Sequence, residues 1–210
     1  MITHIVQPGD TVNYIANMYG ISPDRLILEN EITNPDRMAI GETLLIVYPK
    51  LTYIVQEGDT LSSIADAHGV SWTELLRNNP YISDREELIV GEEIVIQFVD
   101  EKKSSITVNG YAFPYINIGV LKKTLPFLTY LTIIGYRISS NGSIGNIDDI
   151  EIIRLARDYG VGALMQIFTH TDTTLDNNEF QTILYDYALQ DILINNILTM
   201  LRSKGFMEQI

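Results

Sequence analysis

The chain has 210 residues, of which 46% are hydrophobic and none is cysteine, so it can hold one to three small cores but excludes disulfides and thiolate metal sites. Most of the net charge of −13 lies in residues 1–99, where 15 acidic residues stand against 5 basic ones. This charge would repel nucleic acid and anionic membrane surfaces but is compatible with a neutral polymer. No apolar run is long enough to span a bilayer, and the scattered histidines lack metal-ligand spacing, so we expect no metal and no cofactor.

An internal repeat organises the first half of the chain. The stretch HIVQPGDTV at 4–12 returns as YIVQEGDTL at 53–61, 49 residues later. Because a repeat defines the folding unit, we predict two modules, residues 1–49 and 50–99. Each module has the pattern strand–helix–helix–strand, an α+β fold near the size limit of about 40 residues for a core without staples.

The helix ends are the clearest local signals. In the first module the sequence predicts a strand over 3–6, a helix capped by Thr11 and ended by Gly20, a second helix capped by Ser22, and a strand over 43–47. The second module repeats this order, with strands over 52–55 and 93–98 and helices that start at Thr60 and Ser71. Residues 49–51 are predicted to be a linker, and residues 84–87 a solvated loop. For Trp72 we favour packing, with a sugar platform as the alternative.

Both repeats carry the order Val-Gln-x-Gly-Asp-Thr-(Leu/Val)-x-x-Ile-Ala-x-x-x-Gly-(Ile/Val)-Ser, then Leu, Asn and (Ile/Val)-Gly-Glu, which resembles the LysM module. The resemblance implies a βααβ fold that binds N-acetylglucosamine polymers, chiefly peptidoglycan and chitin. It places the sugar in a shallow groove between the first strand–helix loop and the loop before the last strand. The glycan-binding residues that it implies are Gly9, Asp10, Thr11, Val12, Met38, Ala39, Ile40, Gly58, Asp59, Thr60, Leu61, Leu88, Ile89 and Val90.

The residues themselves are compatible with this chemistry. A loop that leads into a helix leaves backbone N–H groups without helical partners, and an acetamido carbonyl can accept from them. Apolar side chains beside the loop can cover the acetyl methyl group. The alternative is that Gly-Asp-Thr is only a turn and a helix cap, a role it has in either case. A shallow site should bind weakly, and two tethered sites should raise the avidity for a repeating polymer.

After a charged linker at 100–105 the pattern changes. Strands are predicted over 106–113, 131–138 and 163–168, none with polar alternation, as is typical of strands buried on both faces. Helices are predicted between and after them, over 118–125, 150–159, 180–187 and 191–203. This β-α-β-α-β-α order predicts an α/β fold with a parallel sheet and right-handed crossovers.

Three stretches of the segment 106–210 resemble the start of a glycoside hydrolase family 18 barrel, especially that of LysM-bearing N-acetylglucosaminidases of spore cortex breakdown and germination. They are NGYA at 109–112, LT…GYRI…NG at 131–142 and NNIL…L…KGF at 195–206. The resemblance implies the first three βα units of a TIM barrel. The family carries its Asp-x-x-Asp-x-Asp-x-Glu run on the fourth strand, with the Glu as general acid and the preceding Asp orienting the substrate acetamido group.

The sequence ends at Ile210 before such a run, so we expect an incomplete segment with no catalytic residue. The carboxylates Asp148, Asp149 and Glu151 are predicted to be a helix cap and first-turn acids. Tyr111, Tyr136 and His170, near the carboxyl ends of the strands, are predicted to be core or rim residues.

Three functions stay open. The first is glycan binding by the LysM modules beside an inactive hydrolase segment. The second is the targeting part of a spore peptidoglycan N-acetylglucosaminidase that is active in a longer chain. The third is a spore-coat docking protein whose third strand pairs with another chain. No secretory signal opens the sequence. The expected location is the spore coat, cortex or cell wall, otherwise the mother-cell cytoplasm, with glycan and spore-coat proteins as partners.

Overall fold

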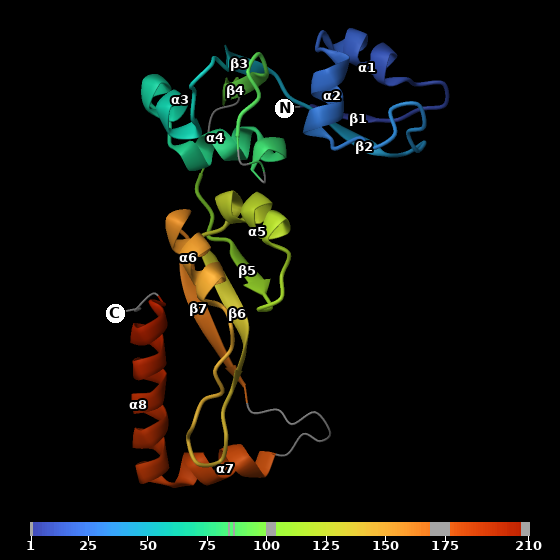
Figure 1. Ribbon diagram of the computed structural model, residues 1–210. Coiled ribbons are helices and arrows are strands. Elements are labelled where there is room, and N and C mark those ends of the chain that lie inside the picture. Colours follow the sequence, from blue (N-terminus) through green and yellow to red (C-terminus); the bar gives the residue numbers. More distant parts are fainter. Residues whose placement is uncertain (1, 84, 86, 100–103, 169–176, 207–210) are drawn as a thin grey trace. The chain divides into compact units, whose positions relative to one another are not determined.

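A computed structural model describes residues 2–83, 85, 87–99, 104–168 and 177–206 (Figure 1). The chain divides into two compact units, Met1–Ser105 and Ile106–Ile210. Among the described residues, no helix combines the length and apolar character that a membrane span requires.

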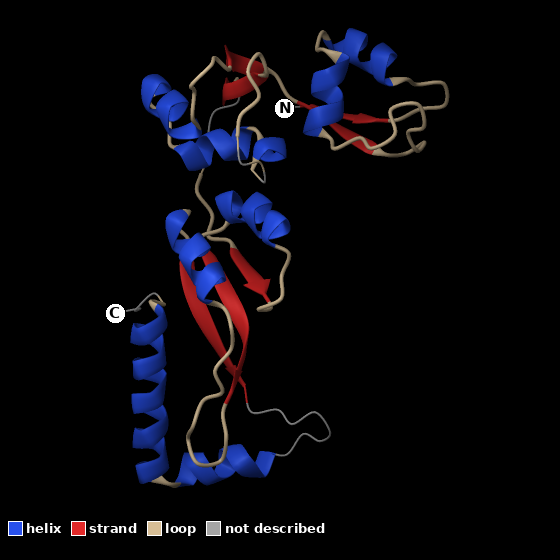
Figure 2. Ribbon diagram, viewed as in Figure 1, coloured by secondary structure: helices blue, strands red, loops and turns tan. Residues whose placement is uncertain are grey.

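The first unit contains the two repeats as two βααβ modules (Figure 2). In each module the two strands pair antiparallel, so the predicted order is confirmed. The first module consists of β1 (Ile2–Ile5), α1 (Val12–Tyr19), α2 (Pro23–Glu29) and β2 (Thr43–Ile46). The second consists of β3 (Pro49–Ile54), α3 (Leu61–His68), α4 (Trp72–Asn78), the 3-10 turn η1 (Pro80–Ile82) and β4 (Glu93–Phe98).

The predicted linker at residues 49–51 is wrong, because these residues are the first part of β3. Pro49 lies opposite Phe98 and Leu51 opposite Gln97, so the end of β4 offers backbone partners that extend the strand. Local composition cannot reveal such a partner, because it is supplied more than 45 residues later in the chain.

The helices begin and end where the capping residues predict. The hydroxyl of Thr11 accepts a hydrogen bond from the backbone of Tyr14 at 3.1 Å, and that of Ser22 accepts from Arg25 at 3.1 Å. Thr60 and Ser71 cap α3 and α4 in the same way, at 3.0 Å each. Gly20 and Gly69 adopt the left-handed conformation just after α1 and α3, which confirms both helix ends.

Each module buries the apolar side of its helices against its strands. An asparagine at the end of the second helix, buried in the second module and partly buried in the first, connects that helix to the last strand. In the second module this is Asn79, whose Nδ2 donates to Leu75 O at 2.9 Å and Val95 O at 2.7 Å, and whose Oδ1 accepts from Val95 N at 2.7 Å. Asn30 makes the matching bonds with Leu26 and Leu45. The core of the first module comprises Val6, Val12, Ile15, Ala16, Leu26, Leu44 and Ile46.

The second unit is an α/β arrangement around a three-stranded sheet. The strands run in the order β5-β6-β7, and both pairs are parallel, as predicted. The elements are β5 (Asn109–Ala112), α5 (Ile118–Thr124), the 3-10 turn η2 (Leu125–Phe127), β6 (Tyr130–Arg137), α6 (Ile150–Asp158), β7 (Gly162–Phe168), α7 (Asn177–Tyr185) and α8 (Tyr187–Lys204). Helix α8 starts four residues earlier than predicted, because Asp186 caps it by accepting from Ala188 and Leu189.

The predicted role of Asp149 as a helix cap needs correction. Asp149 precedes α6 but makes no capping bond, and its carboxylate is buried. It accepts instead from the hydroxyl of Tyr136 and from the ammonium of Lys204, which lies 2.6 Å from Oδ1. A hydroxyl and an ammonium inside a core both require an acceptor, and an anionic one suits the ammonium best. Burial and the hydrogen bond to Asp149 raise the pKa of Tyr136 well above its usual range.

Candidate functional site

The first loop of each module, between the first strand and the first helix, is a tight turn held by its own aspartate. Asp10 Oδ2 accepts from the backbone N–H of Gln7 at 2.7 Å, and Asp59 Oδ2 accepts from that of Gln56 at 2.7 Å. The glycines before these aspartates, Gly9 and Gly58, have φ of 91° and 85°, a conformation that other residues rarely adopt. The repeated Gly-Asp pair is therefore a requirement of the turn.

The second loop, before the last strand, is bonded to the end of the first strand. In the second module Gly91 N donates to Val55 O at 2.9 Å, and Val55 N donates to Glu92 O at 3.0 Å. The first module has the same two bonds between Val6 and the residues Gly41 and Glu42, at 2.9 and 2.8 Å. The two loops of a module therefore lie side by side, as the groove prediction requires.

In the second module these loops enclose a cavity of about 610 Å³. Six of the seven residues that the sequence singles out here line it, namely Gly58, Asp59, Thr60, Leu61, Leu88 and Val90; Ile89 is exposed but is not part of the lining. The other lining residues are Gln56, Ser62, Ile82, Arg85 and Glu87.

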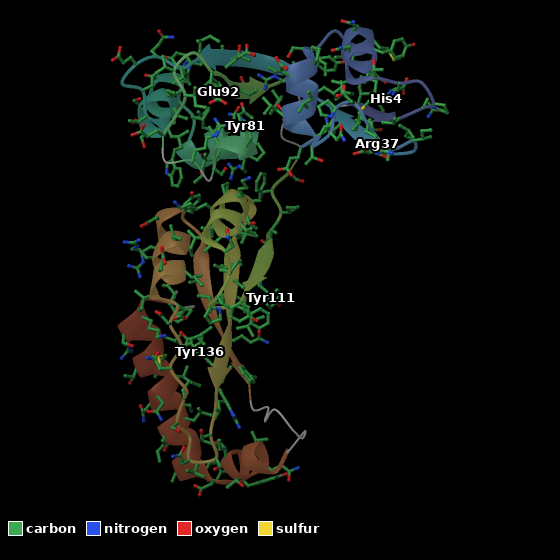
Figure 3. The ribbon with its side chains drawn as sticks, turned by 45° about the vertical axis from the view of Figure 1, so that its right-hand side comes forward. His4, Arg37, Tyr81, Glu92, Tyr111 and Tyr136 are labelled. Carbon is green, nitrogen blue, oxygen red and sulfur yellow. The ribbon has the colours of Figure 1, made fainter. Side chains whose placement is uncertain are left out.

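Arg85 shows that the predicted solvated loop is structured at this position. Its Nη1 lies 2.9 and 2.8 Å from the two carboxylate oxygens of Glu92, and its guanidinium stands 5.6 Å from the ring centre of Tyr81. Burial raises the pKa of Tyr81 to about 12, so the phenol stays neutral. Figure 3 shows Tyr81 and Glu92 in this module. Sequence periodicity does not reveal this pairing, because it joins two irregular segments.

The backbone donors of the first loop are only partly available. In the second module the N–H of Thr60 donates to Ser63 Oγ at 2.9 Å, while Thr60 Oγ1 accepts from Ser63 N. This reciprocal capping box occupies a donor that the loop-to-helix pattern predicts to be free. The first module has no such box, because Tyr14 stands at the position of Ser63.

The apolar residues predicted for the groove divide into two groups. Ile40 and Val90 are 69% and 62% exposed at the tips of the second loops, where a ligand can contact them. Val12 is buried, and Met38 packs on the same core, so these two side chains support the first module from within. Ala39 is exposed, and its N–H donates to Glu42 Oε2 at 3.1 Å, which fixes the loop.

Among the described residues of the second unit, the strand ends bring together no comparable set. Tyr136 belongs to the core, whereas Tyr111 on β5 is exposed (Figure 3). Phe113 and Tyr115 stack nearly parallel in the loop that follows, with ring centres 5.3 Å apart. His170 lies outside the described residues.

A family model, LysM domain, matches residues 4–47 and 53–97. The first unit is thus built from two LysM domains, which supports binding to an N-acetylated glycan. A search of curated proteins gave no match.

Among solved structures, the spore cortex-lytic enzyme SleL of Bacillus cereus is similar, with 23% identity and a TM-score of 0.68, covering 98% of this chain and 49% of that one. SleL of Bacillus megaterium QM B1551 gives 24% identity and a TM-score of 0.68, with 97% and 48% covered. The present chain spans about half the length of these two proteins. The likeness shows the fold, two LysM modules followed by parallel βα units.

Proposed function

We propose that the two LysM domains bind a polymer that contains N-acetylglucosamine, with peptidoglycan as the first ligand class and chitin as the second. The observation that carries this proposal is the cavity of the second domain, which lies between the Gly-Asp-Thr loop and the loop ending at Gly91. The first domain has the same two loops in the same hydrogen-bonded arrangement.

The chemistry of this cavity fits a neutral sugar with an acetamido group. Loop backbone groups supply donors and acceptors for the amide, and the exposed Val90 offers apolar surface for the methyl group. Ile40 offers it in the first domain. The net charge of residues 1–99, with 15 acidic and 5 basic residues, disfavours nucleic acid as the main partner.

Sedimentation of the 210-residue protein with insoluble peptidoglycan and with chitin tests the proposal. A variant with Ile40→Asp and Val90→Asp should stay in the supernatant, because both loops then present a charge where the methyl group is expected. The control is Met18→Asp, which puts the same charge on an exposed apolar position of α1. If the unaltered protein does not sediment, or if the control fails equally, the proposal is wrong.

A second candidate is the targeting part of a spore cortex N-acetylglucosaminidase. It is favoured by a fold match to two cortex-lytic enzymes that runs through both LysM domains and the βα units. This function would place the protein at the cell wall or cortex. The 210-residue sequence contains no Asp-x-x-Asp-x-Asp-x-Glu run, so the chain itself should not hydrolyse a chromogenic N-acetylglucosaminide above the blank. Turnover would contradict that expectation.

A further inference from the structure

The two LysM domains carry the same pair of rings with the two partners exchanged. In the first domain His4 on β1 contacts Tyr19 on α1 edge to face, with ring centres 5.6 Å apart and planes at 78°. The equivalent positions, 49 residues later, hold Tyr53 on β3 and His68 on α3, at 5.3 Å and 66°. The imidazole and the phenol thus exchange places in a contact that both domains contain (Figure 3 labels His4).

The exchange changes which group holds the aspartate of the groove loop. In the first domain His4 Nε2 lies 2.9 Å from Asp10 Oδ2, and His4 Nδ1 lies 3.1 Å from the hydroxyl of Tyr19. In the second domain the hydroxyl of Tyr53 donates to Asp59 Oδ2 at 2.9 Å.

Both carboxylates are bonded to groups of their own domain. Each also accepts the backbone N–H of the loop glutamine at 2.7 Å. The side chains of His4 and Asp10 are only 10% and 8% exposed. In each domain both internal donors bond to Oδ2, and this pair of bonds fixes the turn that precedes the helix.

We propose that Asp10 and Asp59 are positioning residues, which hold the groove loop, and that the exchanged partners make binding depend on pH in the first LysM domain and not in the second. The part that concerns binding rests on the glycan-binding function proposed above. The part that concerns the loop does not.

The physical reason is the charge of the donor. An imidazole is the side chain that ordinarily changes charge between pH 5 and 8. A protonated imidazole donates to the Asp10 carboxylate as a cation to an anion, and this bond is stronger than the one that a neutral imidazole donates to the same carboxylate. The titratable groups that face His4 are Asp10 from the loop and Tyr19 from α1, while the residue opposite on β2 is the uncharged Leu44.

In the second domain the side chain that donates to the aspartate is a phenol, whose charge does not change between pH 5 and 8. The hydrogen bond to Asp59 raises the pKa of Tyr53 above its usual range, so the phenol keeps its proton throughout this interval. His68 touches the ring edge of Tyr53, and no hydrogen bond joins it to Asp59 among the described residues. The bond that holds the second loop therefore stays the same from pH 5 to 8.

The test uses the full 210-residue protein labelled with nitrogen-15. Without glycan, the Gly9 amide resonance should shift with pH between 5 and 8, and the Gly58 resonance should shift much less. On titration with an N-acetylglucosamine oligosaccharide, the Kd measured from first-domain resonances should rise by about threefold from pH 5 to pH 8, since the donor to Asp10 loses its positive charge. The Kd from second-domain resonances should not change.

Two double variants, each with His and Tyr exchanged in one domain, test whether the pH dependence follows the imidazole. His4→Tyr with Tyr19→His copies the arrangement that the second domain already uses, so it should fold and lose the pH dependence. Tyr53→His with His68→Tyr should transfer the dependence to the second domain. A Gly9 resonance that ignores pH, or a dependence that does not follow the exchange, overturns the proposal. Normal Gly9 behaviour with no oligosaccharide binding supports the positioning role and refutes the glycan function, so the two failures are distinguishable.

Discussion

Replacing Lys204 by Met should destabilise the second unit strongly. The carboxylate of Asp149 is completely buried, and the Lys204 side chain is 7% exposed. Lys204 Nζ donates to Asp149 Oδ1 and to the backbone carbonyl of Ile147, both at 2.6 Å. Without the ammonium, the carboxylate keeps the hydroxyl of Tyr136 as its hydrogen-bond partner among the described side chains.

Breaking a buried ion pair by removing one partner costs about 3–5 kcal/mol, because the remaining charge is left uncompensated. This corresponds to a fall of roughly a hundredfold or more in the equilibrium between closed and open forms. Hydrogen exchange followed by mass spectrometry resolves the effect by region, and peptides from β6 and α8 should lose protection by that factor. Peptides from the first unit should not change.

Arg202→Met is the matched control, because it removes one positive charge from the same last turn of α8. Its cost should stay below about 1 kcal/mol, the usual size of an exposed interaction with the helix dipole. Lys204→Met combined with Asp149→Leu should recover part of the lost protection, since no unpaired charge remains. If Lys204→Met behaves like Arg202→Met, or if the double variant is worse than the single one, the buried pair does not act as argued.

Three further predictions concern the LysM domains. Asn79→Ala should lower the stability of the second domain by about 2 kcal/mol, because buried backbone groups of Leu75 and Val95 lose their hydrogen-bond partner. Urea unfolding followed by Trp72 fluorescence measures this loss. The control Asn78→Ala, which removes one bond to the carbonyl of Ile96, should cost less. Gly58→Ala should cost about 1–2 kcal/mol of stability through the positive φ alone, since no neighbouring atom lies within 4 Å of the added carbon. It should also weaken glycan binding by the second domain in the oligosaccharide titration described above. Unchanged stability would contradict the need for glycine in this turn. The pKa of Asp10 lies below its ordinary value of 3.8, first because of the hydrogen bond from the Gln7 backbone and then because of His4. The stability that ionised Asp10 contributes is therefore present above pH 3.8 and is lost as the pH falls through the lowered pKa. The melting temperature of the first domain should fall over this acid range and should fall by less in Asp10→Asn; an equal fall in the variant would contradict the role of Asp10.

The local elements of this protein follow from local residues. Thr11, Ser22, Thr60 and Ser71 cap their helices because each hydroxyl acts on a backbone group three residues away. Strand β6 is shifted by one residue at both ends from the predicted 131–138, and β7 begins one residue before the predicted 163–168. These predictions are close because continuous apolar runs identify buried parallel strands. The groove loops are identifiable because Gly-Asp-Thr recurs at a fixed distance, and a turn that needs positive φ restricts the residue to glycine.

The sequence by itself therefore determines the two βααβ modules, the parallel βα units and the position of the groove loops. The tertiary structure alone decides which side chains meet. It joins Asp10 to His4, Asp59 to Tyr53 and Arg85 to Glu92. It also extends β3 over residues 49–51 and brings Asp149 to Lys204, 55 residues away. Helix caps and periodicity act over three or four residues, whereas these partners are chosen by packing between distant segments, where each buried polar group requires a partner that the local sequence does not contain.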